Sequence, residues 1–218
     1  MNSAEKGLII CGTDTDVGKT VVSALIVQGL SATYWKPIQS GLEDGGDKGR
    51  IRQLINLPSQ RYIEEAYKFK APVSPHWAAE KESQIINPDS LKIPKTDNFL
   101  VIETAGGVMV PLTRNYLQIE QIKKWDFPVV LVTRTSLGTL NHTLLTLEAM
   151  KKRKIKILGL FLNGPNHEDN PKTLEQFGQV PVIGHLPILP NVTAGNLSQQ
   201  WKTQKLFDVF SSLLQFTN

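Results

Sequence analysis

The chain has 218 residues, a formal net charge of +4 and a single cysteine, Cys11. The length suits one α/β domain over residues 1–218, the lone cysteine excludes an internal disulfide bond, and the scattered basic residues give no reason to expect a nucleic-acid partner. No apolar run is long enough to cross a bilayer and the N-terminus lacks the apolar core of a signal peptide, so we expect a cytoplasmic protein without a membrane partner.

Short β-branched runs alternate with helical patterns, which predicts an α/β fold with a mostly parallel sheet and helices on both faces. The expected strands span residues 7–13, 33–38, 99–104, 128–133, 155–162 and 182–186, and the expected helices span residues 19–30, 48–55, 118–125, 140–152 and 197–214. Prolines interrupt residues 57–97, where we expect loops and short helices over the carboxyl edge of the sheet. Ligands of such sheets gather at this edge, so the residues after each strand are the functional candidates.

The first expected strand leads into Gly-Thr-Asp-Thr-Asp-Val-Gly-Lys-Thr at residues 12–20, which is followed by a helix. This is the setting of a phosphate-binding loop, in which backbone N–H groups point at phosphate oxygens, Lys19 supplies a cation and Thr20 offers a hydroxyl to Mg²⁺. The spacer between Gly12 and Gly18 is one residue longer than in the common motif. The sequence therefore predicts a three-layer P-loop NTPase fold.

The second strand carries Lys36 at its apolar end, where a buried cation needs an anionic partner. A lysine that extends to solvent is the alternative. The acidic loop Glu43-Asp44-Gly45-Gly46-Asp47 follows. It suits Mg²⁺ coordination, but an ordinary turn is equally plausible and the sequence does not choose among its acids.

The third strand ends in Glu103, followed by Thr104-Ala105-Gly106-Gly107. A carboxylate there can reach the Mg²⁺ of a nucleotide, and the glycines let backbone approach the γ-phosphate. After the fourth strand, Ser136–His142 opens a helix whose N-terminus would attract a carboxylate, with His142 as a structural residue. The fifth strand ends in Asn163-Gly164 without the Asn-Lys-x-Asp pattern of GTPases, which favours adenine.

Taken together, these motifs resemble those of the dethiobiotin synthetases of biotin biosynthesis. The matching segments are residues 12–20, Trp-Lys-Pro-Ile-Gln-Ser-Gly at 35–41, Asp47, Ser-Pro-His at 74–76, Glu-Thr-Ala-Gly-Gly at 103–107, Leu-Gly-Thr-Leu-Asn-His at 137–142, Asn163 and Leu-Pro-Ile at 186–188. The longer spacer is this family's own form of the loop. Thr104 and Gly164 depart from the family, which usually has Gly and Asp at these positions.

The resemblance implies a homodimeric ligase with active sites at its subunit interface. Such a ligase uses ATP and Mg²⁺ to join CO₂ to 7,8-diaminononanoate and to close the cyclic urea of dethiobiotin. By resemblance, Lys36, Lys19 and Thr15 are catalytic, and Thr20, Asp47 and Glu103 bind the metal. The implied nucleotide contacts are Asp16, Val17, Gly18, Lys19, Thr20, Val21, Asp47, Glu103, Thr104, Ala105, Gly106, Asn163, Gly164, Leu186, Pro187 and Ile188. The implied substrate contacts are Thr15, Ser40, Ser74 and, from the second subunit, Gly138, Thr139, Leu140 and Asn141.

Two further expectations concern the loop and its alternatives. Asp14 and Thr15 would face the diamine, and Asp16 the nucleotide. A related ATP-dependent amidoligase is one alternative, although it would need another substrate pocket. A partitioning-type switch ATPase is the other, but such proteins usually carry a second lysine near the start of the loop, where this chain has Gly12-Thr13-Asp14.

Overall fold

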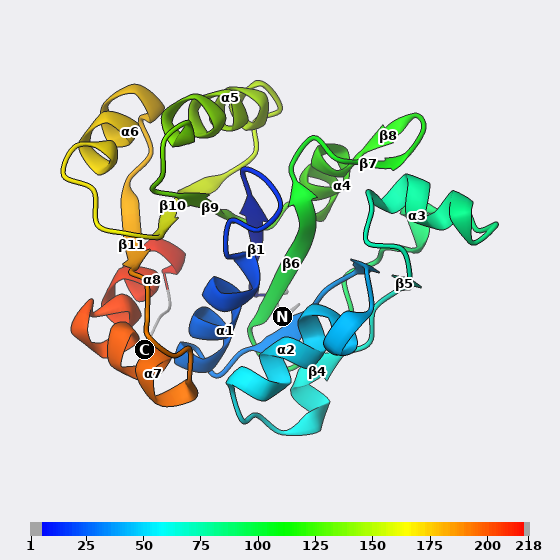
Figure 1. The fold of residues 1–218 in the computed structure, drawn as a ribbon, viewed down its shortest axis with the longest axis horizontal. Helices are drawn as coiled ribbons and strands as arrows, with labels where there is room; N and C mark the ends of the chain where they lie inside the picture. The colour runs from blue at the N-terminus through cyan, green and yellow to red at the C-terminus, as the bar shows by residue number, and fades with distance from the viewer. Residues whose placement is uncertain (1–5, 216–218) are drawn as a thin grey trace.

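The protein is seen here in a computed structural model that describes residues 6–215, with Asp44 described by its backbone alone. The central sheet consists of β1 (Gly7–Gly12), β2 (Thr33–Trp35), β4 (Tyr62–Ile63), β6 (Leu100–Gly107), β9 (Val129–Arg134), β10 (Ile157–Asn163) and β11 (Val182–Leu186). Its strand order is β11-β10-β9-β1-β6-β2-β4, and every neighbouring pair is parallel (Figure 1). The predicted α/β fold with a parallel sheet is confirmed.

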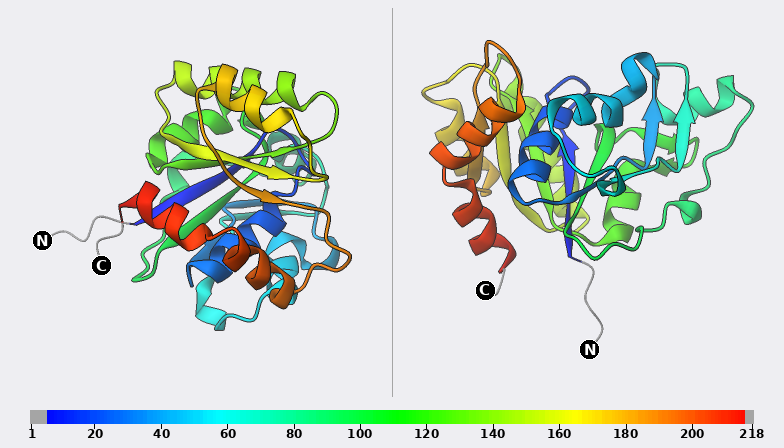
Figure 2. Two further views of the ribbon diagram at one scale, coloured as in Figure 1. Left: turned by 90° about the vertical axis from the view of Figure 1, so that its left-hand side faces the viewer. Right: turned by 90° about the horizontal axis from the view of Figure 1, so that it is seen from below.

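Helices cover both faces of this sheet (Figure 2). One face carries α1 (Lys19–Gly29), α2 (Gly46–Leu54), α7 (Ala194–Thr203) and α8 (Leu206–Leu214), and the other carries α4 (Gln118–Trp125), α5 (Thr139–Lys152) and α6 (Asn170–Gly178). Side chains of β1 alternate between the two cores, Leu8 and Ile10 entering one and Ile9 and Cys11 the other. This alternation follows from the two-residue period of a strand, so β1 is buried on both sides.

The predicted strand at 33–38 is wrong in its extent, because the chain leaves the sheet at Lys36-Pro37. Pro37 has no N–H to donate to a ladder, and its carbonyl oxygen accepts hydrogen bonds from the backbone of Ala66 (2.9 Å) and Tyr67 (3.1 Å). The continuation, β3 (Ile38–Ser40), pairs with β5 (Tyr67–Phe69) in a separate two-stranded sheet. The break places Lys36 at the carboxyl edge of the central sheet.

The predicted helix at 197–214 is also wrong, since α7 and α8 are separate helices. Lys205 between them adopts a left-handed conformation with φ of 51°, which ends the first helix. The break lets Trp201 and Phe210 stack with their ring centroids 5.6 Å apart, against the core on the α1 face. The sequence analysis missed α6, although Pro171 in its first turn and the fully buried Leu174 are helix signals.

Residues 57–97 contain the predicted short helices, namely η2 (Ser59–Arg61), α3 (Pro75–Lys81) and η3 (Pro88–Ser90), and also the unpredicted strands β4 and β5. Two further elements missed from sequence form a hairpin, β7 (Pro111–Thr113) and β8 (Tyr116–Leu117). A 3-10 turn, η1 (Glu43–Gly45), precedes α2. Within residues 6–215, no helix has the length and apolar character needed to cross a membrane.

Candidate active site

A cleft of about 850 Å³ opens where the phosphate-binding loop, β3, α2 and the end of β6 meet. Residues 72–75 close it from the side of α3. The cleft brings together many residues that the sequence singled out: Thr15, Asp16, Gly18, Lys19, Thr20, Val21, Lys36, Ser40, Asp47, Ser74, Glu103, Ala105 and Gly106. Its position at the carboxyl ends of parallel strands is where α/β sheets bind ligands.

The phosphate-binding loop turns sharply at Gly18, which has φ of 95°. A side chain there would also collide with Asn163, whose amide nitrogen would lie 2.1 Å from the added Cβ. Lys19 donates from its ammonium group to the carbonyl oxygen of Asp14 at 2.8 Å. Burial, followed by the nearby charge of Lys36, lowers the pKa of Lys19. The loop is thus closed on itself by the lysine that would bind phosphate.

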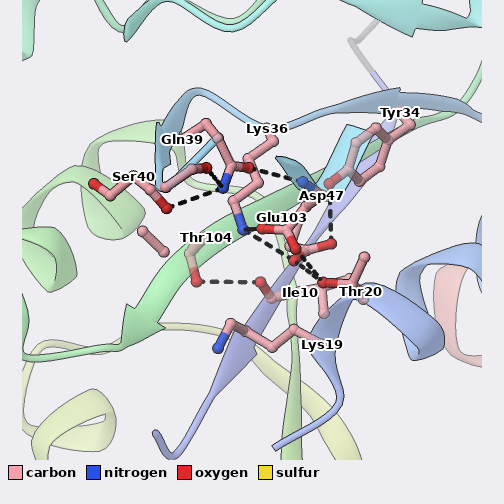
Figure 3. Close-up of polar contacts among 12 residues, drawn as sticks. Ile10, Lys19, Thr20, Tyr34, Lys36, Gln39, Ser40, Asp47, Glu103 and Thr104 are labelled. Atoms are coloured by element: carbon pink, nitrogen blue, oxygen red, sulfur yellow. Dashed lines mark hydrogen bonds and ion pairs between the residues drawn. The ribbon is translucent and has the colours of Figure 1, made fainter. Parts of the chain in front are cut away.

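Beside this loop, Lys36, Asp47, Glu103 and Thr20 form a compact cluster (Figure 3). The ammonium group of Lys36 binds Asp47 Oδ2 and lies 3.1 Å from Glu103 Oε1. The hydroxyl oxygen of Thr20 lies 2.9 Å from both Asp47 Oδ1 and Glu103 Oε1. Lys36 therefore has anionic partners, and the alternative of a lysine extending to solvent is wrong.

The charges in this cluster stabilise one another. Burial alone would lower the pKa of Lys36, but the carboxylates of Glu103 and Asp47 outweigh burial and raise the pKa. Burial alone would raise the pKa of Asp47, but the charge of Lys36 lowers it. Lys36 is therefore a protonated ammonium and Asp47 an ionised carboxylate at neutral pH.

Two buried side chains that the sequence analysis did not single out support the acidic residues, Tyr34 at the Glu103 carboxylate and Gln39 at the backbone of Asp47. The hydroxyl of Tyr34 donates to Glu103 Oε2 at 3.0 Å. The side-chain carbonyl of Gln39 accepts from the backbone N–H of Asp47 at 3.1 Å, while its amide donates to Ser40 and Gly41 carbonyls (Figure 3). The Tyr34–Glu103 bond joins residues 69 positions apart, so no local signal could have predicted it, whereas the Gln39 bonds lie within the loop that leads from β3 to α2.

Other residues of the cleft, Val73 among them, were also missed by the sequence analysis. Glu43 and Arg50 add a charge of each sign to the wall formed by η1 and α2, and Pro72 and Val110 add apolar surface. Glu43 lies within the acidic loop that the sequence did mark. Arg50 lies three residues after Asp47, so on a helix both side chains point to the same face, and this spacing could have predicted Arg50 in the cleft.

Asp14 does not face the cleft as expected. Its carboxylate pairs with Arg134 at 3.2 Å and accepts from the N–H of Thr15 at 2.7 Å. The correction has a simple cause: Arg134 ends β9, the strand beside β1, and offers its guanidinium to the Asp14 carboxylate, while Lys19 binds the Asp14 backbone carbonyl. Thr104 also turns away, because its hydroxyl donates to the carbonyl of Ile10 at 3.2 Å.

The residues expected around a base lie at the ends of β10 and β11, beside the phosphate-binding loop. Asn163 donates from its amide to the carbonyl of Val17 at 3.0 Å. Gly164 donates its N–H to the carbonyl of Leu186 at 3.0 Å. The Leu186 side chain is buried in the core and Ile188 is exposed, with Pro187 between them. None of these residues lines the 850 Å³ cleft, which ends at Gly18.

The start of α5 lies outside the cleft as well. The helix begins after Gly138, which has φ of 92° and no side-chain cap, and Asn141 is exposed. Leu140 packs partly against the core, and the Thr139 hydroxyl is used within the fold, donating to the Arg134 carbonyl at 2.6 Å. This segment contributes nothing to the cleft of its own chain.

The chain is similar in sequence to proteins of one named activity. A family described as an AAA domain matches residues 6–196. The ATP-dependent dethiobiotin synthetase BioD of Rhodopseudomonas palustris (strain HaA2) is 44% identical over 192 residues, which make up 88% of this chain and 90% of that protein. The BioD of strain BisB18 is 42% identical over 94% of this chain and 98% of its own length.

Solved structures show the same fold at much lower sequence identity. A ParA family ATPase from Chlorobium tepidum has a TM-score of 0.59 and 14% identity, covering 97% of this chain and 98% of that one. The septum site-determining protein MinD from Pyrococcus horikoshii, complexed with Mg-ADP, has a TM-score of 0.58 and 14% identity over 96% of this chain and 94% of its own. These likenesses show the fold alone, and they confirm the predicted P-loop fold.

Proposed function

The chain belongs to the ATP-dependent dethiobiotin synthetase family, and we propose that the cleft beside its phosphate-binding loop is where it closes the cyclic urea of dethiobiotin. It is an ATP-dependent ligase of biotin biosynthesis, acting on small molecules. The observation that carries the assignment of the cleft is the meeting of Lys36 with Thr20, Asp47 and Glu103 next to Lys19. A nucleotide and a carbamate could share this space, since both are anions and the cleft holds two buried lysines.

We propose that the loop at 12–20 holds the phosphates of ATP. The first residues of α1 line the cleft and the helix has no side-chain cap, and uncapped N–H groups at a helix start suit an anion. When ATP binds, the ammonium group of Lys19 leaves the Asp14 carbonyl oxygen and binds phosphate oxygens instead. The flexible lysine side chain can reach them by rotation. Asn163, Gly164 and residues 186–188 are proposed to border the base from the ends of β10 and β11.

Mg²⁺ fits the oxygens that converge at Thr20, Asp47 and Glu103, because this cation prefers hard oxygen ligands. No cluster of three or more His, Cys, Asp or Glu side chains suited to a metal occurs among the described residues. The two carboxylates and the hydroxyl would therefore share the cation with phosphate oxygens and water, as is usual for Mg²⁺. When bound, it would neutralise negative charge on the phosphates.

Lys36 is proposed to bind the carbamate. One substrate amine, in its neutral form, captures CO₂ as a carbamate, and a carbamate oxygen then attacks the γ-phosphorus and displaces ADP. The second amine attacks the carbonyl of the resulting carbamic–phosphoric anhydride, closes the ring and expels phosphate. The ammonium of Lys36 stabilises the anionic carbamate and disfavours protonation of the neighbouring amine. Thr15, Ser40 and Ser74 line the same space and can orient the diamine.

The far carboxylate of the substrate is proposed to lie at the start of α5 of a second subunit. This segment is remote from the cleft of its own chain, and its first N–H groups suit an anion. The fully exposed Leu137 beside it is what an interface between two copies would cover. The proposal therefore includes a homodimer with shared sites.

The test is turnover of the purified chain with ATP, Mg²⁺, bicarbonate and 7,8-diaminononanoate. We expect ADP and dethiobiotin in equal amounts, with ADP release falling to background when the diamine is left out. Mass spectrometry identifies the cyclic urea, and a Lys19→Ala variant provides the control that lacks the phosphate-binding cation. ADP release that ignores the diamine, with no cyclic urea formed, would mean that the assignment is wrong.

A further inference from the structure

Glu103 is completely buried, and its two carboxylate oxygens have different partners (Figure 3). Oε1 accepts from the Thr20 hydroxyl at 2.9 Å and from the Lys36 ammonium at 3.1 Å. Oε2 accepts from the hydroxyl of Tyr34 at 3.0 Å. The proposed chemistry engages only the Oε1 side, so the bond from Tyr34 calls for its own explanation.

Tyr34 is held where its hydroxyl has little freedom. It lies in the middle of β2, opposite Val101 of β6 and Tyr62 of β4, and no part of it is exposed. Its ring packs in the core on the α1 face. A carboxylate oxygen accepts and a phenolic hydroxyl donates, so this hydroxyl is aimed at one oxygen of one carboxylate.

We propose that Tyr34 is a positioning residue for the Mg²⁺ site: its hydroxyl fixes Glu103 so that Oε1 alone is presented beside Thr20 and Asp47. The inference rests on the proposed function, in which these three residues hold Mg²⁺. A free carboxylate could rotate and offer both oxygens to a cation, a mode that suits the larger Ca²⁺. Mg²⁺ demands near-octahedral geometry, and hydrogen-bond partners behind a ligand set its orientation.

The competing explanation is that the Tyr34 bond only satisfies a buried carboxylate and stabilises the fold. The chain supplies a matched control on the adjacent strand. Tyr62 is also buried, is the register partner of Tyr34, and donates from its hydroxyl to the carbonyl of Ile55 at 2.9 Å. The Tyr62 oxygen also accepts from the N–H of Leu57 at 3.2 Å, so Tyr62→Phe loses two hydrogen bonds where Tyr34→Phe loses one, and both variants keep the ring. Only Tyr34 touches a proposed metal ligand, so Tyr62→Phe is a demanding control for a purely structural role.

The experiment compares Tyr34→Phe with Tyr62→Phe in the full chain. Calorimetric titration of ADP at a series of Mg²⁺ concentrations gives the apparent Mg²⁺ affinity of the nucleotide complex, and the series is repeated with Ca²⁺. For Tyr34→Phe we expect Mg²⁺ affinity to fall roughly tenfold, the lower end of the effect of such partners, and the preference for Mg²⁺ over Ca²⁺ to narrow. Tyr62→Phe keeps the wild-type affinity and preference, although it loses more hydrogen bonds and lowers the melting temperature at least as much as Tyr34→Phe. Equal Mg²⁺ affinity in the two variants would overturn the inference.

A Glu103→Gln variant separates this inference from the proposed function. If Mg²⁺ does not strengthen ADP binding to the wild-type chain, or Glu103→Gln leaves that gain unchanged, the proposed metal site is wrong. If Glu103→Gln weakens Mg²⁺ binding but Tyr34→Phe does not, only the positioning role fails. Because Tyr34 acts through Glu103, adding Tyr34→Phe to Glu103→Gln should weaken Mg²⁺ binding no further, and a full additive loss contradicts the inference.

Discussion

Two places at the edge of the same sheet differ in whether the polar groups there find partners within this chain. Lys36, directly after β2, and Glu103, within β6, are buried and meet each other, a threonine hydroxyl and a second carboxylate. After β9, by contrast, α5 begins without a side-chain cap and the adjacent Leu137 is fully exposed. In the proposed function, one chain builds the reaction centre, whereas a second copy would complete the surface that recognises the far end of the substrate.

The largest effect is expected at the self-contained end. Lys36→Ala should lower dethiobiotin formation at least about 100-fold, because it removes a cation that stabilises developing charge. Nucleotide affinity should stay within severalfold, since Lys19 and the loop backbone are unchanged. Turnover assays and calorimetric ADP binding measure the two effects. Loss of ADP binding equal to the loss of turnover would place Lys36 in the nucleotide site instead.

Lys48→Ala is the matched control for this variant. Lys48 is also largely buried and lies 2.7 Å from Glu64 and 2.9 Å from Glu65, but it does not line the cleft. Its removal should cost stability and leave most of the turnover. A turnover loss as large as that of Lys36→Ala would show that the assays report folding rather than chemistry.

A smaller effect is expected at the open end. Leu137→Lys should favour the monomer and raise the KM for 7,8-diaminononanoate roughly tenfold, the scale of an anion's interaction with a helix N-terminus. The new lysine cannot repel the substrate carboxylate, so weaker binding must come from the lost partner. Sedimentation and steady-state kinetics measure mass and KM. A variant that sediments as the wild type and keeps its KM would contradict the shared site.

Phe207→Lys provides the corresponding control. Phe207 is half exposed on α8, which lies on the other face of the sheet from α5. Introducing the same charge there should change neither the sedimentation nor the KM. A comparable loss at Phe207 would mean that any surface lysine disturbs the assembly.

The smallest effect concerns pH and the charged cluster in the nucleotide-free chain. The charge of Lys36 lowers the pKa of Asp47 in the folded state below its ordinary value of 3.8, so this pair stabilises the fold above that pH and less as the pH falls through the folded-state pKa. The destabilisation caused by Lys36→Ala should be about 3 kcal/mol at pH 7 and should shrink on acidification. Urea unfolding at pH 7, 4, 3 and 2 measures the free energy of unfolding of both chains, because the stabilisation is lost only below the ordinary pKa of 3.8. A difference that stays constant with pH would contradict the pairing.

The sequence predicted the parts of the site that depend on local patterns. Apolar runs located the strands, the glycines and Lys19-Thr20 located the phosphate-binding loop, and the end of each strand gave Lys36 and Glu103. Parallel strands bring their carboxyl ends to one edge of the sheet, and Lys36 and Glu103 therefore lie in the same cleft.

The parts that failed depend on contacts between distant segments. Lys205 turns the chain between α7 and α8 without a glycine, where Trp201 and Phe210 stack. Asp14 turned to Arg134, a residue 120 positions later in the chain. The sequence next to Asp14 does not indicate Arg134, and the sequence next to Lys205 does not indicate the stacking of Trp201 on Phe210, because both contacts depend on how the elements pack.

Because β3 separates from the central sheet at Pro37, the segment proposed to face the substrate forms a structural unit of its own. Its three residues pair with β5, so substitutions around Ser40, or a longer turn before α2, act on a two-stranded unit and leave the seven-stranded order untouched. A fold built this way can diversify what it accepts while its nucleotide chemistry stays constant. Libraries aimed at the diamine of the proposed function are therefore best placed in residues 40–45, which leaves Gln39 and its bond to the Asp47 N–H in place.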